Sequence, residues 1–149
     1  MRAVIQRVSR ARVSVDGLVR GEIGLGLVVL LAVGRDDTPA IAARMAERVA
    51  QLRIFGDDAG KMNRSLLDTG GAALVISQFT LYGDARGQRR PSFVQAAPPE
   101  LGKNLYEEFV RALEGLGVHA STGTFQAHMS VELTNDGPVT ILLDSENTF

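Results

Sequence analysis

The sequence of 149 residues contains no cysteine and no long hydrophobic run. The lack of cysteine excludes a disulfide scaffold, a thiolate zinc site and a cysteine nucleophile. The longest strongly apolar stretch covers only residues 25–33, whereas a membrane-spanning helix needs about twenty residues. Residues 1–7 place arginine among apolar residues, so they do not form the apolar segment of a signal peptide. We therefore expect a cytoplasmic protein with no membrane partner.

Charges of the two signs are nearly balanced, with 16 basic and 17 acidic residues and a net charge of −1. This balance excludes general electrostatic capture of nucleic acid. The distribution is uneven, because arginines gather in residues 1–20 while residues 132–146 contain acidic residues without basic neighbours. The planar guanidinium group suits phosphate, so a local contact with a polyanion is one interpretation. Solvated strand faces and salt bridges between the two ends of the chain are the other.

The length corresponds to one domain, which we expect to cover residues 1–149. A hydrophobic content of 45% is sufficient for a single core without disulfides. Alternating or continuous apolar patterns predict several short strands, and Asp16-Gly17 predicts a tight hairpin turn between two of them. The predicted strands cover residues 2–9, 10–16, 18–23, 27–33, 72–77, 118–122, 130–134 and 139–143.

Apolar residues at helical spacing predict two helices. The first follows Thr38 and Pro39, an N-cap residue and a first-turn proline, and continues to Leu52. The second covers residues 101–116 and ends before a glycine. Residues 55–61 and 84–91 are expected to be loops. This order predicts an α/β single domain of barrel-like mixed β-sheets with two or three flanking helices, because an open sheet of many short strands would leave bare edges.

Patterns typical of known catalytic or metal sites are scarce. The only two histidines, His119 and His128, do not lie at a metal-ligand spacing from another histidine or a carboxylate, and we interpret both as structural residues. The sequence also lacks a P-loop, a dinucleotide-binding fingerprint and a Gly-x-Ser-x-Gly motif. We therefore expect no cofactor and no metal ion.

A polar segment, Ser77–Asp84, follows the apolar strand predicted for residues 72–77. If the strand continued, Ser77 and Phe79 would face one side of the sheet, and Gln78 and Thr80 would face the other. Polar groups at the end of a buried strand can hold a carbonyl group or an oxyanion. An ordinary strand end explains the same residues without any ligand.

A second segment, Asn135–Thr140, contains Asn, Asp, Gly and Pro between two predicted strands. These are the residue types that favour turns, so the local chemistry indicates a hairpin turn. Only about 5 to 6% of X-Pro bonds in folded proteins are cis. The sequence alone therefore leaves the isomer of the Gly137-Pro138 bond open.

With several other segments in the same order, these two resemble the D-aminoacyl-tRNA deacylases over essentially the full chain. The matching segments are Met1–Val15, Gly60–Asn63, Ser77–Thr80, Arg90–Phe93 and Asn135–Thr140. The resemblance implies a barrel-like carboxylic ester hydrolase that cleaves D-amino acids from the terminal ribose of tRNA. It further implies action on glycine mischarged onto alanine tRNA, and a homodimer whose active sites lie at the subunit interface.

The resemblance also assigns substrate-binding roles to five residues of this chain. Gly137 and Pro138, joined by a cis bond in the family, would reach into the pocket of the other subunit as a chirality gate, and Arg7 would anchor them. Phe125 and Met129 would line the adenosine side of the pocket. A rigid Gly-Pro unit makes physical sense as a gate, because an L side chain would clash with its main-chain atoms and a D side chain would not.

The catalytic residues implied by the resemblance are Ser77, Gln78, Phe79 and Thr80. Thr80 could be a nucleophile, but a threonine hydroxyl needs a base and the sequence places none nearby. Backbone amides around Phe79 and Thr80, with the Gln78 side chain, could instead stabilise an oxyanion while water attacks. The ribose 2′-hydroxyl could assist this second route, which we favour over covalent catalysis.

Two other functions are compatible with the sequence. The first is a non-catalytic RNA-binding barrel, suggested by clustered arginines. The second is an editing esterase for mischarged L-aminoacyl-tRNA. Arg86, Arg89 and Arg90 could meet phosphates of tRNA in any of these functions. A contact with only the acceptor end of tRNA suits the near-neutral net charge, because few phosphates then need to be neutralised.

Overall fold

Strand β1 is the centre of the sheet in the computed structural model, which describes residues 1–149. β8 pairs with β1 along most of its length, β3 pairs with its first half and β2 with its second half. Parallel pairing adds β6 to β3 and β7 to β6. The sheet consists of β1 (Arg2–Val15), β2 (Leu18–Ile23), β3 (Gly26–Ala32), β6 (Ala72–Ser77), β7 (His119–Thr122) and β8 (Ser130–Asp144).

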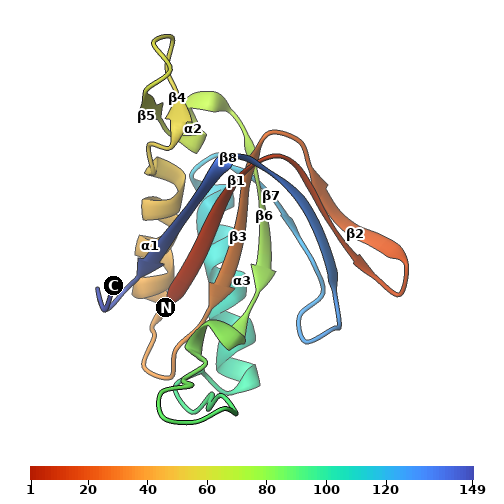
Figure 1. The fold of residues 1–149 in the computed structure, drawn as a ribbon, viewed down its shortest axis with the longest axis vertical. Coiled ribbons are helices and arrows are strands. Elements are labelled where there is room, and N and C mark those ends of the chain that lie inside the picture. The colour runs from red at the N-terminus through yellow and green to blue at the C-terminus, as the bar shows by residue number, and fades with distance from the viewer.

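The mixed sheet curls into a nearly closed barrel (Figure 1). β2 approaches β7 closely, and the Ser121 hydroxyl donates a hydrogen bond of 3.4 Å to the carbonyl oxygen of Glu22. Three α-helices lie outside the sheet, namely α1 (Pro39–Gln51), α2 (Leu66–Thr69) and α3 (Pro99–Gly115). The predicted fold class is therefore confirmed. No helix of the structure is both long and apolar enough to cross a membrane.

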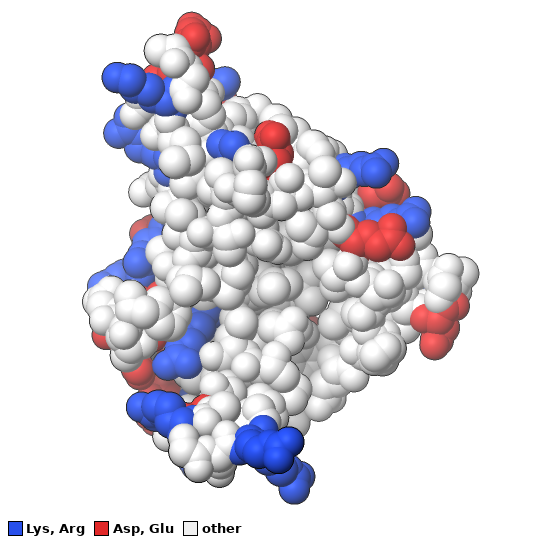
Figure 2. Space-filling view, viewed as in Figure 1, with Lys and Arg blue, Asp and Glu red and all other residues white.

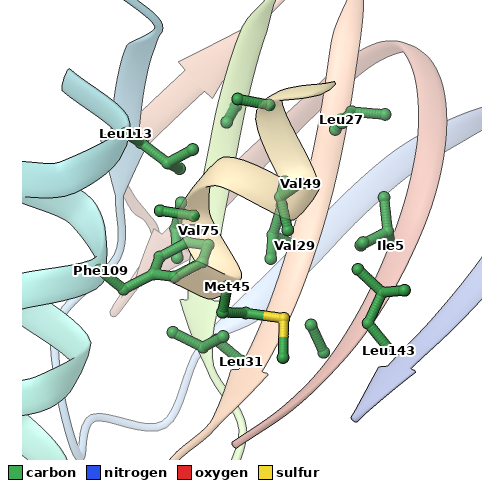
Figure 3. Packing of buried hydrophobic residues seen from close by; sticks show 14 of the residues in the cluster. Ile5, Leu27, Val29, Leu31, Met45, Val49, Val75, Phe109, Leu113 and Leu143 are labelled. Carbon is green, nitrogen blue, oxygen red and sulfur yellow. The ribbon is translucent and has the colours of Figure 1, made fainter. Parts of the chain in front are cut away.

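The main hydrophobic core lies between the sheet and helices α1 and α3 (Figure 3). Met45 and Val49 of α1 pack against the β3 strand, and Phe109 of α3 lies beside them with its side chain fully buried. α1 begins as predicted, because the Thr38 hydroxyl accepts a hydrogen bond of 3.4 Å from the Ile41 amide. Burial of one such large side chain stabilises the fold by about 1.5 to 3 kcal/mol.

A second, smaller core fills the inside of the curl, on the face of the sheet away from the helices. β3 contributes to both cores, since Val29 faces the helices and Val28 faces the curl. This burial on both faces explains why β3 is a continuous apolar run without alternation. The buried residues of the second core are Val8, Ala11, Val13, Ile23, Val28, Leu74 and Ile76.

Arginines of β1 form ion pairs with acidic residues of β8. The Arg12 Nε lies 2.8 Å from a carboxylate oxygen of Glu132, and the Arg2 Nε lies 3.4 Å from a carboxylate oxygen of Asp144. Both pairs join residues that are directly opposite in the β1–β8 ladder. The expected salt bridges between the two ends of the chain are confirmed, and the contact with a polyanion stays a prediction.

Several expected boundaries are wrong. The separate strands predicted for residues 2–9 and 10–16 form the single strand β1, and those predicted for 130–134 and 139–143 form the single strand β8. Irregularities in the β1–β8 register let both strands bend without ending. The loop expected over residues 55–61 belongs to a small hairpin of β4 (Phe55–Gly56) and β5 (Met62–Arg64).

Helix α2 is not among the predicted helices, because its four residues form only about one turn and are too few to show helical periodicity. Its sequence signal is nevertheless present in a capping box. The Ser65 hydroxyl accepts a hydrogen bond from the Asp68 amide, and the Asp68 carboxylate accepts one from the Ser65 amide.

A close approach between β3 and β6 generates a stability prediction. A Cβ atom added at Gly26 would lie 1.8 Å from the carbonyl oxygen of Ala72, whereas one added at Gly24 meets no atom within 4 Å. We expect Gly26→Ala to lower the free energy of unfolding by about 3 kcal/mol or more, because the backbone cannot yield locally. Gly24→Ala is the matched control and should change it by less than about 0.5 kcal/mol. Chemical denaturation measures both, and equal stability of the two variants would contradict the packing.

Candidate functional site

A cavity of about 640 Å³ lies where the parallel strands β3 and β6 end and where α3 begins. Such strand ends are common ligand-binding positions in sheets of this kind. Ser77, Gln78 and Phe79 line it from the end of β6, and Phe125 and Met129 line it from the segment between β7 and β8. The structure thus brings together five residues that the sequence analysis singled out.

The backbone after Ser77 turns away from the sheet. β7 pairs with β6 only as far as Val75, and the ladder with β3 ends when the Gln78 amide donates to the carbonyl oxygen of Leu31 at 2.8 Å. Without a partner on either side, the chain forms a short 3₁₀ helix, η1 (Phe79–Tyr82). The strand therefore ends at residue 77, as predicted, and the alternating faces of a continued strand are not formed.

The 3₁₀ helix places the polar groups of this segment together. The opening N–H groups of a helix have no partner inside it, so the amides of Phe79 and Thr80 stand free at the start of η1. Of these two residues, Phe79 lines the cavity and Thr80 follows it in the helix. The Gln78 side-chain amide donates a hydrogen bond to the Thr80 hydroxyl. The Phe79 ring is 58% exposed and meets Phe93 edge-on, with 5.2 Å between ring centroids.

The opposite wall of the cavity is held by buried aromatic packing. The Tyr106 ring lies 6.0 Å from that of Phe125, and its hydroxyl donates a hydrogen bond of 2.7 Å to the carbonyl oxygen of Val75. Burial raises the pKa of Tyr106, so this hydroxyl remains a donor at neutral pH. Met129 packs against the second core from the same wall.

The segment Asn135–Thr140 is a bulge inside β8 and not a hairpin turn. Residues 135–140 of β8 lie opposite only residues 6–8 of β1. The parts of β8 before and after this segment both pair with β1. The Asn135 side chain closes the bulge, because its Oδ1 accepts from the Val139 amide at 2.7 Å and its Nδ2 donates to the Val139 carbonyl oxygen at 3.1 Å. The Gly137-Pro138 bond is cis.

Arg7 contacts this bulge from β1. Its Nε donates to the carbonyl oxygen of Asp136 at 2.8 Å, and its Nη1 donates to the carbonyl oxygen of Ile54 at 2.6 Å. The Asp136 carboxylate lies 4.0 Å from the same Nε. Arg7 therefore joins the bulge to the segment before β4.

The bulge and the cavity of one chain lie apart. Ser77 pairs with Leu31, which pairs with Ala3, whereas the bulge is level with Arg7. The two features are therefore about 13 Å apart along the strands and about 14 Å apart across them, from standard strand dimensions. Gly137 and Pro138 do not line the cavity of their own chain.

The structure also places the two histidines and the arginines of residues 84–91. His128 is exposed and lines the cavity, and His119 is exposed with a ring nitrogen 3.5 Å from the Ser121 hydroxyl. No spacing signal in the sequence connects His128 with the polar segment after β6. Arg86 forms a 2.6 Å ion pair with Asp84 that lowers the pKa of this carboxyl group, while Arg89 and Arg90 are exposed.

The fold and the cavity define a single-domain barrel-like α/β protein with a pocket at the ends of its parallel strands. Residues 4–144 match the family model described as D-Tyr-tRNA(Tyr) deacylase. The chain belongs to this family. A D-aminoacyl-tRNA deacylase of Symbiobacterium thermophilum is 62% identical over 100% of this chain and 99% of its own length. One from Fervidobacterium nodosum is 58% identical over the whole of both chains.

Solved structures agree with the fold. A structure described as the c-Myc DNA unwinding element binding protein has a TM-score of 0.90 and 37% identity, and the match covers 97% of this chain and 98% of that one. A probable eukaryotic D-amino acid tRNA deacylase has a TM-score of 0.82 with 18% identity, and the match covers 95% of this chain and 97% of that one. The second likeness concerns the fold alone.

The hydrogen bonds of Asn135 generate a prediction about the bulge. Asn135→Ala removes both side-chain contacts to Val139, and one such bond contributes about 1 kcal/mol. We expect the Val139 amide to exchange its hydrogen about fivefold faster or more in this variant. Thr134→Ala, one residue outside the bulge, should leave this rate unchanged. Hydrogen–deuterium exchange measures both, and unchanged protection in Asn135→Ala would show that the side chain does not hold the bulge.

Proposed function

We propose that this chain hydrolyses the ester bond of D-aminoacyl-tRNA and thereby frees tRNA that carries the wrong enantiomer, in the cytoplasm. The observation that carries this proposal is the match of residues 4–144 to the family model, together with relatives at 58–62% identity that are named D-aminoacyl-tRNA deacylases. The bulge around Gly137, which Arg7 and Asn135 hold by hydrogen bonds to its backbone, supports the same activity.

The active form that we propose is a homodimer in which the bulge of one subunit enters the cavity of the other. The distance between the bulge and the cavity of one chain supports this arrangement, because the two cannot meet within one copy. Few charged side chains lie at the centre of the face over the first half of β1 and the second half of β8 (Figure 2). On this face, Val4 lies between its strand partners Leu30 and Leu142. The Leu142 residue is 53% exposed. Burial of such a face between two copies is favourable.

Chirality in this proposal is read by main-chain atoms. Carbonyl oxygens of the Gly137-Pro138 unit accept hydrogen bonds from the α-amino group of the substrate. An L side chain would then collide with the backbone of the unit, while a D side chain points away. Because no side chain of the enzyme takes part in the selection, many D-amino acids are accepted. Glycine has no side chain to reject, so glycine mischarged onto alanine tRNA is a further substrate.

The chemical step that we propose is attack by water with stabilisation of the oxyanion. The amides of Phe79 and Thr80 and the side chain of Gln78 are the donors. The Thr80 hydroxyl has as its partner the amide nitrogen of Gln78, which cannot take up a proton. This contact supports a positioning role for Thr80 over a nucleophilic one. The ribose 2′-hydroxyl of the substrate can assist as an internal proton acceptor or donor.

The remaining substrate contacts concern the terminal adenosine and the phosphates. Phe125 and Met129, on the wall opposite η1, are the proposed adenosine contacts, and stacking of a base on an aromatic ring contributes about 1 to 3 kcal/mol. Arg89 and Arg90 are the better candidates for phosphate, because the charge of Arg86 is compensated by Asp84.

A paired assay tests the activity and its stereochemistry. Without added metal, the wild-type protein should release D-tyrosine from D-tyrosyl-tRNA and leave L-tyrosyl-tRNA intact. Gly137→Ala should lower the D-to-L rate ratio at least tenfold, because φ at Gly137 is +148° and an added Cβ would lie 2.8 Å from the Val139 side chain. Equal wild-type rates on both enantiomers would contradict the proposal. Tight binding of tRNA without hydrolysis would favour a non-catalytic RNA-binding barrel. Hydrolysis of mischarged L-aminoacyl-tRNA would favour an editing esterase.

Mixing two impaired variants tests the dimer. Thr80→Ala should lower kcat about 10² to 10³-fold by disturbing the oxyanion donors, and a loss beyond about 10⁴-fold would favour a nucleophile. Arg7→Met should release the bulge. Because half of the randomly mixed dimers are hybrids with one intact site, mixing equal amounts should restore about a quarter of wild-type activity. Each variant mixed with itself is the control. Activity that stays at the mean of the two variants would place the bulge and cavity in one subunit.

A further inference from the structure

The side chain of Arg2 contacts the 3₁₀ helix η1 from the side away from its first residues. Its Nη1 donates a hydrogen bond of 3.0 Å to the carbonyl oxygen of Leu81. Its guanidinium carbon lies 4.6 Å from the centre of the Tyr82 ring, which is buried. One side chain of β1 therefore contacts both of the last two residues of η1.

The C-terminal segment covers the same guanidinium group. The Phe149 ring lies 5.6 Å from the guanidinium carbon of Arg2. The Arg2 Nε is buried without a hydrogen bond and lies 3.4 Å from the carboxylate of Asp144, which is 2% exposed. Asp144 in turn accepts hydrogen bonds from the Glu146 amide at 2.9 Å and from the Thr148 hydroxyl. Residues 144–149 thus hold Arg2 against the helix.

These contacts use properties that only arginine combines. The last carbonyl oxygens of a helix have no partner within it, and a cation at that end both satisfies one of them and complements the helix dipole. The guanidinium group is planar, so it donates to a carbonyl oxygen and stacks on an aromatic ring at the same time. Lysine would keep the charge near Asp144 but lose the stacking geometry.

The charges around Arg2 remain fixed at neutral pH. Burial alone would raise the pKa of Asp144, but hydrogen bonds from Thr148 and Glu146, with Arg2 nearby, lower it overall. Burial and the carboxylates of Asp37 and Asp144 raise the pKa of Tyr82, so its ring stays neutral. The Asp144 carboxylate and the neutral Tyr82 ring are therefore both present beside Arg2 at neutral pH.

We propose that Arg2 is a positioning residue for deacylation, which fixes η1 so that the amides of Phe79 and Thr80 meet the oxyanion. The proposal rests on the proposed function of these amides. Arg2 does not line the cavity, and the proposed adenosine contacts are on other elements. Loss of Arg2 therefore misplaces the donors without removing the surface that binds substrate. A misplacement of about 1 Å at a site can cost about 10²-fold in rate.

Steady-state kinetics with D-tyrosyl-tRNA test this assignment. Arg2→Met should lower kcat about 10- to 100-fold with KM within about threefold of wild type. The kcat of Arg2→Lys should lie between that of wild type and that of Arg2→Met. Phe149→Ala, which removes an exposed ring, should lower kcat less than Arg2→Met does. Arg12→Met is the matched control, because Arg12 lies on the same strand and pairs with Glu132 far from η1. Its kcat should equal that of wild type. Rates are expressed per folded enzyme, from thermal melts of each variant.

A second readout does not depend on turnover. In amide NMR spectra, Arg2→Met should shift the resonances of Phe79 and Thr80, whereas Arg12→Met should not. Unchanged resonances, an unchanged kcat, or a raised KM with unchanged kcat in Arg2→Met would each overturn the positioning role. A wild-type protein that does not hydrolyse D-aminoacyl-tRNA would refute the proposed function instead, and the resonances would still decide whether Arg2 sets the position of η1.

Discussion

The pairing of β1 with β8 is the constraint on which the rest of the structure depends. This antiparallel ladder extends from Arg2 opposite Asp144 to Ser14 opposite Ser130, and its bends let one sheet serve two cores. The same ladder is interrupted once on β8, where residues 136–139 have no partners opposite. The ladder continues on both sides of this interruption, so residues 136–139 form a bulge between paired residues. The Gly137-Pro138 unit therefore lies within the longest pairing in the fold.

The order of strands also determines why one copy is not enough for the proposed reaction. β8 and β6 lie on opposite sides of β1, with β3 between β1 and β6. The bulge of β8 and the cavity at the end of β6 are consequently separated by the width of the sheet. Bending of the backbone cannot close this distance without breaking the β1–β3 ladder. In the proposed twofold homodimer, each bulge would meet a cavity that its own chain cannot reach.

Local chemistry accounts for the parts of the fold that the sequence predicts correctly. Thr38 and Pro39 start α1, and Asp16 and Gly17 form the predicted turn with φ of 50° and 77°. The wrong expectations depend on distant partners. Residues 2–15 form one strand, and the Asn135–Thr140 segment is a bulge, because β1 and β8 pair on both sides of the irregularity.

In the candidate site, too, the sequence predicts what local residues determine and misses contacts between elements that are distant in the chain. The family resemblance supplied the residues at 77–80 and 137–138, but no local pattern places Arg7 against Ile54 or His128 beside the cavity. Those contacts join elements far apart in the chain, and a single sequence contains no signal for them. The roles of these residues therefore rest on the resemblance and on the proposals that their geometry supports.

The proposed chemistry is carried by main-chain groups, and this has a consequence for the side chains around them. In the proposed mechanism, carbonyl oxygens of the bulge select the substrate and amides of η1 stabilise the oxyanion. Backbone groups cannot be tuned by substitution, so their placement must come from side chains that bind the neighbouring carbonyls. Arg7 does this for Asp136, and Arg2 does it for Leu81. Both arginines lie on β1, so the strand that organises the sheet also aligns the two halves of the proposed active site. An ammonium group could pair with the nearby carboxylates in either place, but it lacks the planar fork whose separate N–H groups reach two carbonyl oxygens at Arg7 and which lies over a ring at Arg2.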